Sequence, residues 1–299
     1  MNQTTIQNPE WFLSEQDLVQ VIDTAASKRP NGTRHDTSCN RFVLAAAIKA
    51  YRDRTRTLNT PVISKLEQLF RPTLDLPPTY RNLTLDEIEI DSLQTQLPAF
   101  LAMTEPHELH TNKRAILKCL RDSMNELCCL SLLSFSCKRP NIDERVVVTV
   151  QRVVDPRSIM FFRSFIDSET FTENQLEDLA YFLTHCIFSI TCYGLLPVQR
   201  ELACSLQQLA GLLWQLVPRV LALGHVELLL ETMMVLRVTG FEPEQALAEL
   251  SVPARSLLSE ITTVRPPWKT RSGKVFSTWH LVAVLMQCLW MPEICASSP

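Results

Sequence analysis

A stripe of polar and aromatic side chains runs through an otherwise apolar stretch of the chain. Its members are Asp178, Tyr181, His185, Phe188 and Cys192, which follow one another at steps of three or four residues. Because a helical turn takes 3.6 residues, these side chains share one face of a helix. We predict that His185 is a general acid or base, because imidazole titrates near neutral pH, and that Tyr181 hydrogen-bonds with it. Asp178, Phe188 and Cys192 are predicted to line a substrate site.

A second histidine, His280, opens the last apolar segment of the chain. Two histidines on apolar helices can converge in one cavity, and we predict that His280 helps to position the substrate beside His185. The segment before it, residues 264–280, carries Trp268, Trp279 and four basic residues. We predict that both tryptophans contact substrate and that this loop is a lid or an anion-binding edge. An exposed linker is the alternative interpretation of this segment.

A structural role for the histidine stripe stays open at this point. A buried polar side chain must either be hydrogen-bonded within the protein or line a cavity. If a neighbouring helix satisfies the ring of His185, this residue is an ordinary core histidine. The sequence alone does not separate the two interpretations.

No metal site and no particular cofactor are predicted. The segment His107–His110, "HELH", has the spacing of one helical turn but lacks the HExxH pattern of metalloprotease helices. We interpret it as a helix start on the surface. The chain also lacks the GxSxG, Walker and GxGxxG patterns, so no nucleophile or nucleotide cofactor is indicated.

Composition limits the partners and the compartment. The formal net charge of −3 gives no general attraction to nucleic acid or to anionic lipid, so neither is predicted as a partner. The ten cysteines show no CxxC spacing, and the N-terminus lacks the features of a secretory signal. Reduced thiols in the cytoplasm are the simplest interpretation.

The elements that must hold these residues are predicted to be helices. Only six of 299 residues are glycine, which disfavours hairpins and barrels. Thr172 and Gln175 predict a capping box at the start of a helix that runs to about Tyr193. We expect this helix to be buried in protein and not to span a membrane, and we predict another helix at 225–240. Further helices are expected at 198–216, interrupted near Pro218, then as two short ones at 242–250 and 252–264, and from residue 275. The β-branched run 144–154 is interpreted as helical, because no second strand is available to pair with it.

Two motifs of the chain resemble the histidine-bearing motifs of a poorly characterised family of bacterial all-helical proteins. They are Thr184-His185-x-x-Phe188-x-x-Thr191-x-x-Gly194 and Thr278-Trp279-His280-Leu281-Val282. Members of that family often lie among natural-product biosynthesis genes. The resemblance covers about residues 112 to 290 and departs from the pattern at 192–193, 279 and 281. It implies an α/α-toroid-like fold in which the two histidines face a shared cavity, and it implies no particular reaction.

Together these features predict an all-α protein of antiparallel helical pairs, either α/α-toroid-like or an irregular bundle. We divide it into an N-terminal helix and polar arm (1–36), a helical subdomain (37–110) and a main helical domain (111–299). The predicted function is a biosynthetic or tailoring enzyme that acts on a small apolar or peptide-derived substrate, with His185 as acid or base. The alternative is a non-catalytic helical module that binds a protein or a ligand. Whether the chain forms a homo-oligomer is left open.

Overall fold

The fold is described by a computed structural model that covers most of the predicted main helical domain. The described residues are 117–118, 120–122, 124–125, 127–128, 131, 144–168, 172–194, 196–241, 243–263, 269–273, 275, 280–281, 284–285 and 288. Of these, 81% are helical, and a single isolated bridge between Lys269 and Val275 is the only extended pairing among them. The predicted all-α class is confirmed. The boundaries at 36/37 and 110/111, the segment His107–His110, Trp268 and Trp279 lie outside the described residues.

Helices account for nearly all of the ordered elements. The continuous helices in the described part of the chain are α7 (Glu144–Val153), α8 (Pro156–Ser168), α9 (Glu173–Thr191), α10 (Ala203–Leu223), α11 (Val226–Thr239) and α12 (Pro243–Thr262). The described residues between 117 and 131, and those between 280 and 288, are also helical. The β-branched run that could have been a strand is α7, as predicted.

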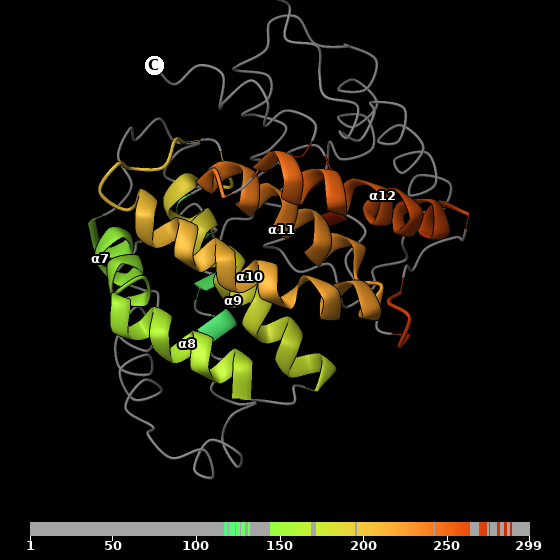
Figure 1. The fold of residues 1–299 in the computed structure, drawn as a ribbon, viewed down its shortest axis with the longest axis horizontal. Helices are drawn as coiled ribbons and strands as arrows, with labels where there is room; N and C mark the ends of the chain where they lie inside the picture. Colours follow the sequence, from blue (N-terminus) through green and yellow to red (C-terminus); the bar gives the residue numbers. More distant parts are fainter. Residues whose placement is uncertain are drawn as a thin grey trace, which may run out of the picture.

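Helix α9 occupies the centre of the arrangement. It packs against α7, α10 and α11, while α10 also contacts α8, and α12 covers the outer side of α11. In Figure 1 the green helices α7 and α8 lie on one side and the orange helices α11 and α12 on the other, with α9 and α10 between them. From Leu176 to Thr191 every residue of α9 except Tyr181 is buried, as predicted for a helix enclosed by protein.

The start of α9 is set by the predicted capping box. The Thr172 hydroxyl accepts a hydrogen bond from the backbone N–H of Gln175, and the Gln175 side chain accepts one from the backbone N–H of Thr172. These reciprocal bonds satisfy two donors that a helix N-terminus otherwise leaves without partners. They fix where the helix begins and therefore the rotation at which Tyr181 and His185 face inward.

Loss of this cap has an expected cost. Thr172→Ala should lower the free energy of unfolding by about 1 kcal/mol, because an N-cap hydroxyl typically contributes that much. Thr172→Ser keeps the hydroxyl and should remain close to the wild-type value. Chemical denaturation of the three proteins checks this, and an alanine variant as stable as the serine variant would contradict it.

The end of α9 has an unusual backbone. Cys192 and Tyr193 adopt left-handed conformations with φ of 48° and 56°, followed by Gly194 at 77°. Left-handed backbone is strained for residues that carry a Cβ, and such strain persists only where the surrounding structure holds it. Here the turn directs the ring of Tyr193 back along the helix, where it stacks on Phe188 with ring centroids 4.7 Å apart.

Three predicted helix boundaries are wrong. The last helix does not begin at residue 275, because Val275 pairs with Lys269 in the isolated bridge. Helix α10 continues through Pro218, and α12 is one helix that contains Pro253 where two short helices were expected. A proline inside a helix removes one hydrogen bond and crowds the carbonyl four residues earlier. The buried residues on both sides of each proline continue at helical spacing, and we attribute the unbroken helices to that burial.

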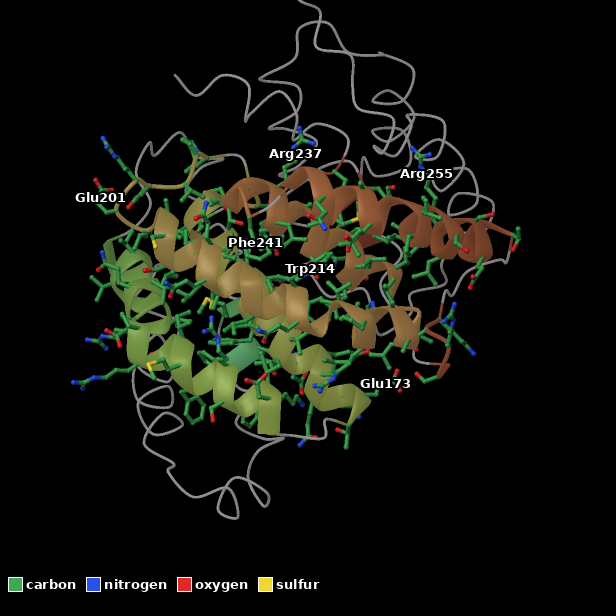
Figure 2. The ribbon with its side chains drawn as sticks, in the orientation of Figure 1. Glu173, Glu201, Trp214, Arg237, Phe241 and Arg255 are labelled. Atoms are coloured by element: carbon green, nitrogen blue, oxygen red, sulfur yellow. The ribbon has the colours of Figure 1, made fainter. Side chains whose placement is uncertain are left out.

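Many charged side chains lie on the outside of the described helices. Figure 2 shows Glu201 and Arg255 pointing away from the helices, and both are exposed. Trp214 on α10 and Phe241 after α11 are partly buried against the core. Within the described residues, no helix combines the length and hydrophobicity needed to cross a bilayer.

Candidate functional site

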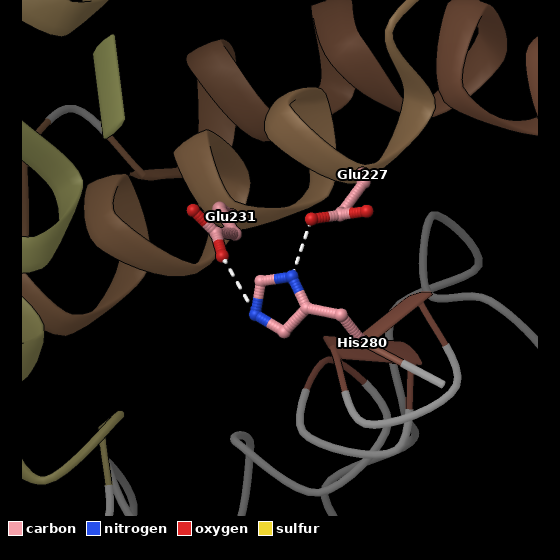
Figure 3. Close-up of side chains that lie close together, drawn as sticks. All are labelled: Glu227, Glu231 and His280. Carbon is pink, nitrogen blue, oxygen red and sulfur yellow. Dashed lines mark hydrogen bonds and ion pairs between the residues drawn. The ribbon is translucent and has the colours of Figure 1, made fainter. Parts of the chain in front are cut away.

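Two buried carboxylates lie on α11, which is otherwise almost entirely apolar toward the core. Glu227 and Glu231 are four residues apart and therefore lie on the same face of the helix, with exposed fractions of 3% and 0%. His280 lies between them from the C-terminal helical segment (Figure 3). Its Nδ1 donates a hydrogen bond to Glu227 Oε1, and its Nε2 is 3.4 Å from Glu231 Oε1. One imidazole thus links both carboxylates.

His185 approaches the same group from α9. Its Nε2 is 3.9 Å from Glu231 Oε1, the oxygen that also faces His280. Neither ring nitrogen of His185 has a hydrogen-bond partner among the described residues, although the ring is buried. The two predicted histidines therefore face one carboxylate oxygen, and His185 is not sealed by a hydrogen bond from a neighbouring described helix.

Two hydroxyl groups of α9 orient the glutamates. The Thr184 hydroxyl donates to Glu231 Oε2 at 3.1 Å, and the Tyr181 hydroxyl donates to Glu227 Oε1 at 3.1 Å. Both contacts arise because α9 packs directly against α11. They leave Glu231 Oε1 and Glu227 Oε2 without a hydrogen-bond donor among the described residues.

A second histidine–carboxylate pair lies next to Tyr181. His225 precedes α11, and its Nδ1 accepts a hydrogen bond from the backbone N–H of Leu228 at 3.4 Å. The neutral ring therefore carries its proton on Nε2, which is 3.5 Å from Glu177 Oε1 and 3.4 Å from the Tyr181 hydroxyl. We call the six buried residues the histidine–glutamate cluster: Glu177, His185, His225, Glu227, Glu231 and His280.

Burial and neighbouring charges set different protonation states within the histidine–glutamate cluster. Burial, reinforced by His280 and Arg121, lowers the pKa of His185 to about 3, so its ring is neutral at pH 7. Burial also disfavours charge on His280, but Glu227 and Glu231 outweigh it and raise the pKa of His280 to about 9. Burial raises the pKa of Glu231 to about 7. The pKa of Glu227 is lowered despite its burial, because His280, His225 and Tyr181 stabilise its carboxylate.

Part of the histidine–glutamate cluster has the composition of a metal centre. Glu227, Glu231 and His280 each offer one ligand atom, and these atoms lie within 4.8 Å of one another. Two carboxylate oxygens and one imidazole nitrogen are ligands that zinc, iron and manganese accept.

The metal-free protein is expected to lose stability between pH 7 and pH 9. The folded state holds the His280 proton up to a pKa of about 9, against 6.5 for an ordinary histidine, so this contribution is present below pH 6.5 and is lost as the pH rises through 9. Glu231, with its pKa raised from 4.5 to about 7, also makes the protein less stable as the pH rises, between pH 4.5 and pH 7. His185 has the opposite effect between pH 3 and pH 6.5. Its pKa is lowered from 6.5 to about 3, so the stability that it contributes rises with pH in that range.

Denaturation at several pH values in the presence of a chelator measures this effect. The slope can reach about 1.4 kcal/mol per pH unit for one group, and His280→Gln should remove most of it. Stability that is constant or rises from pH 7 to pH 9 would contradict the assignment of a protonated His280.

The structure brings together only some of the residues predicted for the site. His185, His280 and Tyr181 meet around the two glutamates. Asp178 is buried but forms an ion pair with Arg121. Phe188 lies beside His185, with ring centroids 6.3 Å apart, and stacks on Tyr193. Cys192 is buried in the core, where its thiol donates to the Ser131 carbonyl at 3.5 Å.

Sequence reasoning did not identify Glu227, Glu231, Glu177 or His225. One signal was present in the printed sequence. The segment 225–240 places two glutamates four residues apart inside a helix that is apolar all round, and such a helix is normally buried. Carboxylates at those positions must be paired or hold a cation. Their partners on α9 and at residue 280 become apparent only in three dimensions.

Comparison with protein-family models, with curated proteins and with solved structures finds no match to this chain. The resemblance to the family of bacterial all-helical proteins, and the toroid-like closure that it implies, therefore stay predictions.

Proposed function

We propose that this chain is an enzyme that acts on a small apolar or peptide-derived substrate, and that His185 is the group that exchanges a proton with it. The observation that carries this proposal is the ring of His185, which is 5% exposed and has no hydrogen-bond partner for either nitrogen among the described residues. Leaving a buried polar group without a partner costs about 1–3 kcal/mol. A bound molecule that contacts the ring would offset this cost.

The surroundings of His185 support a role toward a ligand. The ring lies between Tyr181, with centroids 5.7 Å apart, and Tyr193, at 6.3 Å. The Tyr193 hydroxyl is buried and also has no hydrogen-bond partner among the described residues. Two polar groups without partners in the described part of the chain, flanked by aromatic rings, suit a molecule with an apolar body and at least one hydrogen-bonding group.

The neutral state of His185 determines what it can do. A neutral imidazole has one lone pair that can accept a proton and one N–H that can donate a hydrogen bond. His185 would therefore act as a general base, and because a pKa of about 3 makes it a weak one, a bound substrate or an ionised Glu231 beside it would have to raise that pKa toward neutral pH. The Glu227–His280 ion pair lies nearby and would supply fixed charge for the reaction.

The alternative of a non-catalytic helical module has less support from the described surface. Such a module needs an exposed apolar groove for its partner. Among the described residues, the large exposed hydrophobic side chains are Met160 on α8 and Val252 on α12, which lie on different helices. The proposal includes a biosynthetic role, which the identity of the substrate would test. It also includes a cytoplasmic location.

A substrate search with a matched variant tests the proposal. The protein is incubated with libraries of apolar small molecules and short peptides, and mass spectrometry records every compound whose mass or abundance changes. We expect at least one change with the wild type that is absent with His185→Leu and retained with the surface variant Glu201→Gln. Identical product formation by wild type and His185→Leu, or no change in any compound, would count against the proposal.

A further inference from the structure

We propose that Glu227, Glu231 and His280 bind one divalent transition-metal ion of the class that takes mixed oxygen and nitrogen ligands, such as Zn²⁺, Fe²⁺, Mn²⁺ or Co²⁺. This inference goes beyond the proposed enzymatic function and does not depend on it, because a metal bound at this place could also serve the fold alone.

The spacing of Glu231 Oε1 and His280 Nε2 suits such an ion, and Glu227, which contacts Nδ1 on the other side of the ring, would turn its carboxylate to reach it. The ligand atoms of the three residues lie within 4.8 Å of one another, and Glu231 Oε1 is 3.4 Å from His280 Nε2. Two ligands of a tetrahedral ion with bonds of about 2.1 Å lie about 3.4 Å apart. The three side chains come from α11 and from the C-terminal helical segment, so the ion would connect two elements that are far apart in the sequence (Figure 3).

The charges at this point also favour a cation. Two fully enclosed carboxylates face one imidazole, which carries at most a single positive charge. Buried charges are normally paired or bound to a metal, because removing them from water is costly. A divalent ion would balance both carboxylates and would contact Glu231 Oε1, which has no hydrogen-bond donor among the described residues.

His185 is an independent observation that points to the same place. Its ring is more than nine-tenths buried, and its Nε2 faces Glu231 Oε1 from 3.9 Å without a hydrogen-bond partner among the described residues. The ring therefore lies against the oxygen that the ion would use. Either the ion or a molecule bound to it would give this nitrogen a partner.

Hydrogen bonds from neighbouring hydroxyl groups orient both glutamates. Thr184 holds Glu231 Oε2, and Tyr181 holds Glu227, so each carboxylate has a fixed orientation. Hydrogen bonds of this kind orient metal ligands and tune their affinity. The nearby thiols have other partners, because Cys128 donates to the His185 carbonyl and Cys288 to the Leu230 carbonyl. An oxygen and nitrogen ligand set is therefore expected.

Titration of the full-length protein with metal tests the inference. After treatment with a chelator, the protein is titrated calorimetrically with Zn²⁺, and in parallel with Co²⁺, whose visible absorption reports coordination geometry. We expect one ion per chain and a higher melting temperature. Glu231→Gln and His280→Gln should each abolish stoichiometric binding, and Thr184→Val should weaken it by about 10–100-fold, as loss of a group that orients a ligand typically does.

A matched control addresses the other histidine motif of the chain. The double variant His107→Gln, His110→Gln should bind Zn²⁺ as the wild type does. No binding of Zn²⁺ or Co²⁺ by the wild type, or binding that is lost only in this double variant, would overturn the proposal.

The wild type alone gives a second test if the buried variants fail to fold. X-ray absorption of its Co²⁺ form should show only oxygen and nitrogen ligands, whereas sulfur ligands would place the ion at the cysteines and overturn the site. Metal binding without turnover would contradict the enzymatic proposal alone, and turnover by a protein that binds neither Zn²⁺ nor Co²⁺ would contradict this inference alone.

Discussion

Replacing His280 with alanine is expected to lower the free energy of unfolding of the metal-free protein by about 3–5 kcal/mol near pH 7. The reason is that His280 donates to Glu227, which is 3% exposed and carries a negative charge. Removing one partner of a buried ion pair leaves the other charge without compensation, which costs more than the pair itself contributes. Urea denaturation in the presence of a chelator measures this loss.

A double variant separates the lost ion pair from the lost packing. Glu227→Gln removes the charge that His280→Ala leaves behind, so the combined variant should be more stable than His280→Ala alone by at least about 1 kcal/mol. If Glu227→Gln instead lowers the free energy of unfolding by the same amount with and without His280, then His280 does not stabilise the charge of Glu227. The assigned ion pair would then be wrong.

The second large effect is expected at His185, and it separates function from stability. His185→Leu should reduce turnover of any substrate that is found by about 10²–10⁴-fold, which is the usual contribution of a general acid or base. The same variant should be as stable as the wild type or more stable by about 1 kcal/mol. Leucine fills much of the volume of the ring and has no polar atoms to leave without partners.

A structural role for His185 would give the opposite result. If the ring nitrogens were bonded within the protein, His185→Leu would unfold at a lower denaturant concentration, and turnover would fall only in proportion to the folded fraction. His185→Ala provides the comparison, because it leaves a cavity and should be destabilised by packing loss whatever the role of the ring.

The sequence was sufficient to predict the fold class and the main features of α9. A threonine followed three residues later by glutamine, with acidic residues in the next turn, marks a helix start by local chemistry, and the structure has the capping box there. Gly240 ends α11 for an equally local reason, since it adopts the left-handed backbone at φ 66°. Features of this kind depend on neighbours in the chain and can therefore be predicted without coordinates.

The boundaries at Pro218 and Pro253 could not be predicted in the same way. The local tendency of proline to end a helix is real, but each helix buries apolar residues on both sides of its proline. Tertiary burial outweighs the loss of one hydrogen bond. Whether burial outweighs the lost hydrogen bond depends on the neighbouring helices, which the local sequence does not specify.

The candidate site was predicted only in part, for a related reason. Amphipathic spacing placed His185 and Tyr181 on one face of a helix, and the structure shows that face toward α11. The same spacing placed Asp178 there too, but Arg121, which is 57 residues away in the sequence, forms an ion pair with it. Glu231 became important only because His185, His280 and Thr184 converge on it from two other parts of the chain.

A crystal structure of the protein, grown without chelator, tests most directly whether the histidine–glutamate cluster is a functional site. We expect electron density for a group that is not protein, either an ion, a water or a bound molecule, within hydrogen-bond distance of a ring nitrogen of His185 and next to Glu231 Oε1. A ring of His185 that instead donates to a backbone carbonyl, with its other nitrogen packed against apolar side chains and no such density, would contradict a functional role.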